Sequence, residues 1–355
     1  MTENSRRFPN RKKRPSRRAP GWIAPALAGV VAVAVTWGIG STVFHGVLVD
    51  HGLPEQVKDA SDDERALWIQ GAELADLATR ANKLAELADG DESQGLASLG
   101  ASLSQGSALL GELQFEEDSP AQAPSSYTPE LAATLLQDVA NFSASMPALE
   151  EPTLERNQLL SEIAFQVNLD ALDASESLDE KNVPELAQPL SATTQDENSQ
   201  PVSCLPAGDL LDPSTPVGEA KDLESVTVAR ALDRGYALDF ILQLQAARGS
   251  SAEVNGIEEQ RTALGKQLQT LRSVIDTQCA DLRQPAYALP DKGLDNLDKV
   301  AADAREDFDD ALVLAAGNSD GEARATIANV AFGALRDDSA GIPDQRVLET
   351  GTGVN

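Results

Sequence analysis

Histidine is the side chain most often used for acid–base catalysis and for zinc, and this chain of 355 residues has two, His45 and His51. His45 directly follows an uncharged apolar run, His51 lies six residues further on, and both precede every amphipathic segment. A Ser-His-Asp or Cys-His arrangement is therefore excluded from the rest of the chain, and a zinc site of the usual type is not expected there. We interpret both histidines as residues at a membrane interface; a joint metal or proton-transfer role is the alternative.

Carboxylates are abundant, but their spacing does not match a metal motif. The run Glu306–Asp310 lies in a helical pattern, whereas a calcium loop needs ligands at alternate positions around a Gly turn. A calcium loop beginning at Asp89 fails because its twelfth position is Gly100. Asp233 falls on an apolar helical stripe and is interpreted as a buried, hydrogen-bonded carboxylate. No metal site and no cofactor is predicted; a carboxylate ligand set would have to begin from Asp233 and Glu306.

The two cysteines, Cys204 and Cys279, are the remaining reactive side chains. Two cysteines in an exported chain more often pair than not, so we predict a disulfide that closes a loop of about 75 residues. The chain-entropy model gives about 4–5 kcal/mol for such a bridge. Two unrelated free thiols are the alternative, and the C-x-x-C spacing of a redox-active pair is absent.

The charge of the chain is strongly asymmetric. There are 57 acidic and 28 basic residues, for a formal net charge of −29, yet residues 1–20 carry eight basic side chains against Glu3 alone. A basic arm and an acidic body indicate two environments. Because nucleic acids are polyanions, the acidic body repels them, and no nucleic-acid partner is expected.

An uncharged run of 23 residues, Trp22–Phe44, follows the basic arm. As a helix it spans roughly 34 Å, enough for a hydrocarbon core of about 30 Å. The positive-inside rule keeps the arm in the cytoplasm and exports the rest of the chain. The predicted order is a basic cytoplasmic tail, a transmembrane helix and a juxtamembrane connector, at residues 1–20, 21–46 and 47–60. The bilayer contacts residues 22–44, and the basic residues from Arg6 to Arg18 are available to anionic headgroups.

Alternative interpretations of the basic arm and the apolar run remain open. A cleaved signal peptide would give a secreted protein, but its apolar core is normally shorter, and the Ala-x-Ala triplets here lie inside the run. The Arg-Arg pairs of the arm resemble twin-arginine export signals, although the surrounding residues fit that motif poorly. A small residue at every fourth position from Ala24 to Gly40 would allow self-association of the span.

Beyond the connector, apolar residues recur at helical spacing, and no stretch alternates in the manner of a strand. A first bundle of four helices is predicted at 61–178. Its capping signals are Ser61 with Glu64, Thr128 with Pro129, and Thr153. Four amphipathic helices joined by short loops favour a bundle.

Residues 179–218 contain six prolines and are predicted to be an interdomain linker. A second four-helix bundle is predicted at 219–338, followed by a flexible tail at 339–355. Its helices are expected to begin near Glu219 and to cover 252–279, 294–316 and 322–336. The expected fold class is therefore all-α, with a single N-terminal transmembrane helix and two tandem helical bundles.

Two short segments of the second bundle carry a resemblance. Residues 229–236 (Ala-Arg-Ala-Leu-Asp-Arg-Gly-Tyr) and 285–290 (Pro-Ala-Tyr-Ala-Leu-Pro) resemble a family of actinobacterial ferritin-like domains of unknown function, over about residues 219–345. The resemblance implies a ferritin-like four-helix fold. It implies no iron chemistry, because di-iron bundles need a Glu-x-x-His from each of two helices and this region has no histidine.

The sequence therefore favours a membrane-anchored, extracytoplasmic, non-enzymatic module that interacts with a protein partner or belongs to the cell envelope. The alternative is a ferritin-like bundle that binds a metal or a small ligand through carboxylates such as Asp233 and Glu306. An enzyme is not expected, because no catalytic constellation is found.

Overall fold

The computed structural model describes residues 60–111, 124–146, 149, 153–178, 183–192, 201–204, 222–277, 279, 283–290 and 293–337. The predicted tail, transmembrane helix and C-terminal tail lie outside these ranges, as does nearly all of the connector. Among the helices described, none combines the length and the apolar character needed to cross a bilayer. The described residues form eight α-helices and no strand, which confirms the all-α class.

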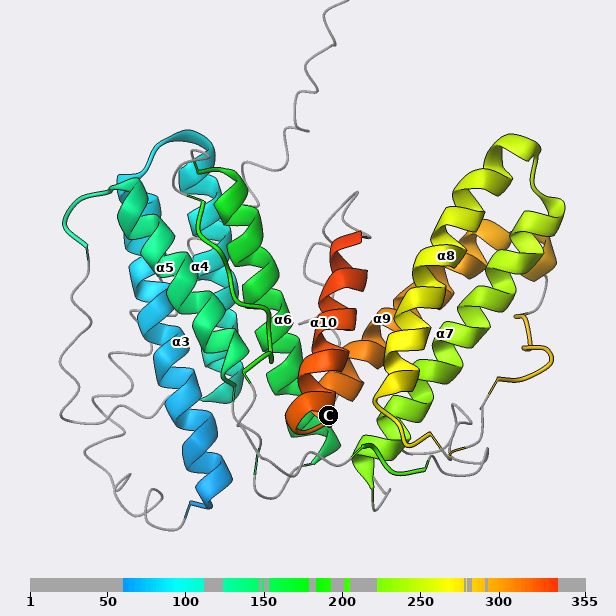
Figure 1. The fold of residues 1–355 in the computed structure, drawn as a ribbon. Helices are drawn as coiled ribbons and strands as arrows, with labels where there is room; N and C mark the ends of the chain where they lie inside the picture. The colour runs from blue at the N-terminus through cyan, green and yellow to red at the C-terminus, as the bar shows by residue number, and fades with distance from the viewer. Residues whose placement is uncertain are drawn as a thin grey trace, which may run out of the picture. The chain divides into compact units, whose positions relative to one another are not determined.

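The first four helices pack on one another (Figure 1). They are α3 (Asp62–Leu87), α4 (Gly90–Leu110), α5 (Pro129–Ala144) and α6 (Leu154–Glu176). Helix α3 contacts α4 and α5, and both of these contact α6. The side-chain oxygens of Thr128 and Thr153 accept hydrogen bonds from the backbone N–H groups of Leu131 and Arg156, so the predicted caps begin α5 and α6.

The last four helices form a second packed group, shown from yellow-green to red in Figure 1. They are α7 (Leu223–Arg248), α8 (Ser251–Ser273), α9 (Leu297–Gly317) and α10 (Gly321–Asp337), with a short 3₁₀ helix, η3 (Gly293–Asp295), before α9. Helix α7 contacts α8 and α9, and α10 contacts the same two helices. The Asp222 carboxylate caps α7 by accepting a hydrogen bond from the backbone N–H of Ser225 at 3.1 Å.

Helices α6 and α9 join the two groups within the compact unit Asp62–Asn355. Asn157 on α6 donates from Nδ2 to Oδ1 of Asn318 at the end of α9, at 3.0 Å, and both side chains are buried. A Cβ at Gly317 would lie 2.7 Å from the carbonyl oxygen of Asn157, so this approach requires glycine.

The described parts of the predicted linker pack against the helices. In 183–192, Leu190 is buried and its backbone N–H donates to the carbonyl oxygen of Ser143 at 2.9 Å. The backbone N–H of Ala192 donates to the carbonyl oxygen of Ala144 at 3.0 Å. Two carbonyls at the end of α5, which have no partner within the helix, are satisfied in this way.

The predicted disulfide between Cys204 and Cys279 is present, with 5.1 Å between the two Cα atoms. It ties residues 201–204 to the chain that follows α8. Two backbone hydrogen bonds reinforce it: Val202 N–H donates to the carbonyl oxygen of Val274, and Asp276 N–H donates to that of Val202. The pairing of Val202 with Ile275 is an isolated parallel bridge.

Three predicted helix limits were wrong. In each case a polar group outside the observed helix forms hydrogen bonds with the backbone where the helix begins or ends. Helix α8 ends at Ser273 and not near 279, since the next residues bond to Val202. Helix α9 begins at Leu297 and not at 294, because Asn296 caps it. Helix α7 begins at Leu223 and not near 219, where Asp222 provides the cap.

Helix α7 approaches both of its neighbours very closely at Gly235. A Cβ at this position would lie 2.5 Å from Cδ2 of Leu268 on α8 and 2.8 Å from Cε2 of Phe308 on α9. Phe308 is fully buried, so its ring has little room to move. The small residue therefore sets how closely the three helices pack.

This contact predicts opposite effects for two glycine substitutions. Gly235→Ala should lower the free energy of unfolding by about 1–3 kcal/mol, because a methyl group overpacks the core. Gly265→Ala should raise it by about 0.5–1 kcal/mol, since Gly265 lies within α8 with nothing near its would-be Cβ. Urea denaturation of the two variants and the wild type measures both changes. An unchanged or higher stability for Gly235→Ala would contradict the close packing.

Candidate functional site

Three charged residues on one stretch of α7 form a polar cluster in the second helical group. Arg230, Asp233 and Arg234 lie three and four residues apart, which places them on neighbouring turns of one helix face. Asp233 is 6% exposed, as expected from its place on the apolar stripe. Gln284, which follows α8, donates from Nε2 to Oδ1 of Asp233 at 3.2 Å. We call these four residues the α7 charge cluster.

Residues 283–287, which follow α8, contact α7 around this cluster. The guanidinium of Arg283 lies 4.7 Å from the ring centre of Tyr236, a cation–π distance. Tyr287 packs against Phe240 with 6.0 Å between ring centres. The hydroxyl of Tyr287 also accepts a hydrogen bond from the backbone N–H of Gln284 at 3.2 Å. The chain after α8 is thus held against the face of α7 that carries Asp233.

Burial changes the protonation of the cluster. Desolvation raises the pKa of Asp233 above 3.8, although Arg234, the hydrogen bond from Gln284 and Arg230 oppose this rise. The pKa of Arg230 is lowered, first by burial and then by the charge of Arg234, against the opposite effect of Asp233. Each charged group is therefore only partly compensated by its neighbours.

Arg230 is the least satisfied member of the cluster. Its Nε and Nη2 atoms are buried and have no hydrogen-bond partner. Arg234, at the next turn, makes no hydrogen bond or ion pair within the described part of the chain. Chemically, the cluster offers guanidinium donors and one buried carboxyl group whose pKa is raised by desolvation.

The two carboxylates considered as metal ligands occupy different surroundings. Asp233 is buried on α7 beside two arginines, whereas Glu306 is exposed on α9. In the ranges that the structure describes, no three His, Cys, Asp or Glu side chains form a group that could hold a metal ion. His45 and His51 lie outside those ranges.

Sequence reasoning identified Asp233 but missed its partners. Gln284 lies 51 residues further along the chain and carries no pattern of its own. The residues Arg230 and Arg234 stand in a recognisable segment, yet nothing in the sequence indicates that they lack acidic partners. The one available signal was their spacing of four, which places two like charges on adjacent helical turns.

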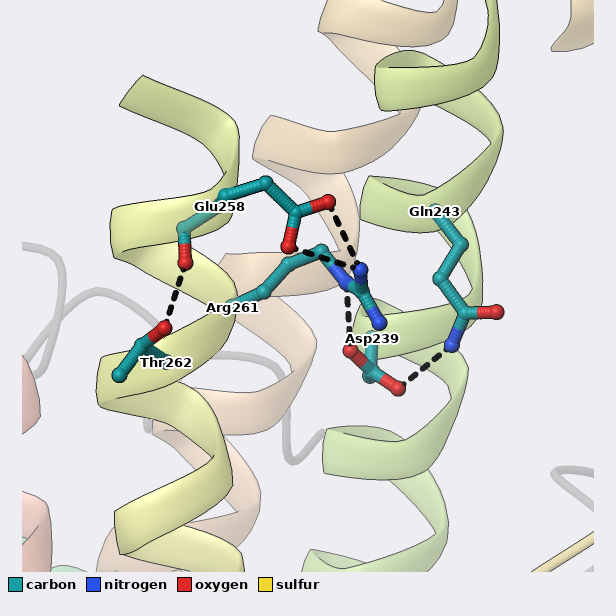
Figure 2. A network of polar contacts seen from close by, with 5 residues as sticks. All are labelled: Asp239, Gln243, Glu258, Arg261 and Thr262. Atoms are coloured by element: carbon teal, nitrogen blue, oxygen red, sulfur yellow. Dashed lines mark hydrogen bonds and ion pairs between the residues drawn. The ribbon is translucent and has the colours of Figure 1, made fainter. Parts of the chain in front are cut away.

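A second polar cluster links α7 to α8 (Figure 2). In this cluster the arginine forms hydrogen bonds with carboxylate partners. Arg261 donates from Nε to Oδ1 of Asp239 at 3.0 Å and from Nη1 to both carboxylate oxygens of Glu258. Gln243 donates to the second oxygen of Asp239 at 2.7 Å. Burial would lower the pKa of Arg261, but bonds to the two carboxylates outweigh it and raise that pKa. We interpret this network as a structural tie between the helices.

Comparisons with family models, curated proteins and solved structures found no significant match. The resemblance to ferritin-like domains therefore stays a prediction.

The raised pKa of Asp233 predicts how stability depends on pH. The folded state binds the proton of the Asp233 carboxyl group more tightly than the unfolded state does. The contribution of this proton to the free energy of unfolding is therefore fully present below pH 3.8 and is lost as pH rises through the pKa of the folded state. Asp233→Asn has no such proton. Its free energy of unfolding, relative to the wild type, should therefore increase with pH over that interval and then level off.

Urea denaturation across that pH interval measures this difference. Gln284→Ala is the matched variant, because it removes a hydrogen bond that lowers the pKa of Asp233 and should extend the interval to higher pH. A difference between Asp233→Asn and the wild type that is constant, or that shrinks as pH rises, would contradict the assignment.

Proposed function

We propose that this chain is a membrane-anchored, extracytoplasmic binding module without catalytic activity of its own. The observation that carries the proposal is the Cys204–Cys279 disulfide. Structural disulfides persist in oxidising compartments and are rare in the reducing cytoplasm. The bridge closes a loop with a sequence separation of 75, so its loss would release a long segment.

The N-terminal sequence supplies the second line of support. The run Trp22–Phe44 is long enough to cross a bilayer, and the basic residues before it favour an N-terminus in the cytoplasm. This orientation would put both cysteines on the oxidising side, so the two independent features agree. Retention of the span gives an anchored protein, and its cleavage would give a secreted one.

A binding role fits the chemistry of the helices better than catalysis. Both histidines of the chain precede the helices, which removes the commonest general base from them. The buried carboxyl group of Asp233 is held by an amide and flanked by guanidinium groups, so it is poorly placed to coordinate a divalent cation. The same guanidinium groups suit a ligand of opposite charge.

Tags at both ends of the full-length chain give a direct measurement of this topology. In intact spheroplasts, external protease should remove the C-terminal tag and leave the N-terminal tag protected in the membrane fraction. Before protease is added, both tags should be detected on a single band of a denaturing gel. This band should migrate faster without reductant, because the disulfide compacts the unfolded chain.

The control is the variant Cys204→Ser with Cys279→Ser, whose mobility should not depend on reductant. A protected C-terminal tag, or reduced cysteines in the wild type, would overturn export. Release of the C-terminal tag into the medium without the N-terminal tag would replace the anchored protein by a secreted one.

A further inference from the structure

Helix α7 holds two arginines in an arrangement that is unfavourable in the free protein. The Nε and Nη2 atoms of Arg230 are buried without any hydrogen-bond partner, although the residue as a whole is only partly buried. Unsatisfied buried donors are rare in folded proteins and need an explanation. Arg234 lies four residues on, where like charges repel.

This lack of partners is not caused by a shortage of acids. The chain has 57 acidic residues against 28 basic ones, and Arg261 on the facing helix makes ion pairs with two carboxylates. For Arg230 the repulsion from Arg234 is a larger influence on its pKa than the attraction of Asp233. Asp233 in turn accepts its hydrogen bond from Gln284 and not from either arginine.

We propose that Arg230 and Arg234 bind the phosphate group of a ligand. A guanidinium presents several N–H donors in a planar fork that matches phosphate oxygens, and two guanidiniums one turn apart can hold one tetrahedral anion between them. Arg230 and Arg234 are both only partly buried, so each keeps some surface accessible from solvent. This inference rests on the proposed binding role and names the chemistry of its ligand.

Asp233 has a defined part in this site. As a carboxylate it opposes an incoming anion, and the hydrogen bond from Gln284 offsets part of its negative charge. Asp233→Asn keeps the size of the side chain and removes its charge. It should therefore strengthen phosphate binding, an effect that a purely structural role for Asp233 would not produce.

Calorimetric titration of the full-length chain in detergent with inorganic phosphate tests the proposal, with chloride at equal ionic strength as the reference. Binding should be specific for phosphate and weaken at least about tenfold in Arg230→Gln and in Arg234→Gln. Lys266→Gln is the matched control, because it removes one positive charge from an exposed position on α8. Its affinity should equal that of the wild type.

Binding to vesicles of phosphatidylcholine doped with phosphatidic acid tests whether the phosphate belongs to a lipid headgroup or to a soluble ligand. The basic tail is also expected to bind such vesicles, so only the difference between the wild type and Arg234→Gln reports on α7. A lipid source predicts a loss in this variant; a soluble source predicts no loss, together with the loss in the phosphate titration.

Equal heats with phosphate and chloride, or phosphate binding retained in both arginine variants, would overturn the inference. If Arg230→Gln does not fold, Arg234→Gln decides, because its side chain is only half-buried. The tag experiment reports on export independently, so a failure here leaves the topology intact, and a failure there leaves the phosphate site intact.

Discussion

The close packing of α7 at Gly235 is the constraint on which the second helical group depends. At this point Leu268 of α8 and Phe308 of α9 approach so closely that no side chain fits between them. Helix α7 is therefore fixed between its two neighbours, and the face it presents to them is buried. Asp233, two residues earlier, is also buried, so its carboxyl group lies in an environment of low dielectric constant.

In such an environment, a charged side chain is costly to leave without a partner. Where α7 meets α8 further along, Asp239, Arg261 and Glu258 form ion pairs with one another, and because these side chains are partly exposed the pairs contribute modestly to stability. At Arg230 the same helix leaves buried guanidinium nitrogens without a partner. The arginine on α8 is therefore paired, whereas the arginine on α7 is the one that we propose binds a ligand.

The local features of the fold could be predicted from the sequence. Apolar spacing and the caps at Thr128 and Thr153 located helices whose limits depend on neighbouring residues. The bridge between Cys204 and Cys279 followed from the cysteine count and the expected compartment. Asp233 was expected to be buried because of its place on the α7 stripe.

Features set by distant residues could not be predicted. The end of α8 depends on Val202, more than seventy residues earlier, which bonds to the chain where the helix would have continued. The partner of Asp233 is Gln284, which reaches it only after the chain turns back over α7. The isolation of Arg230 is likewise a property of the packed structure, since composition alone predicts an abundance of acidic partners for every arginine.

A crystal structure of the full-length chain grown with selenate, a tetrahedral anion with a strong anomalous signal, would locate an anion on α7 directly. An anomalous peak is expected between the guanidinium groups of Arg230 and Arg234, within hydrogen-bond distance of both. Absence of selenium at this position, or a carboxylate of the chain itself bound to Arg230, would contradict the proposed site.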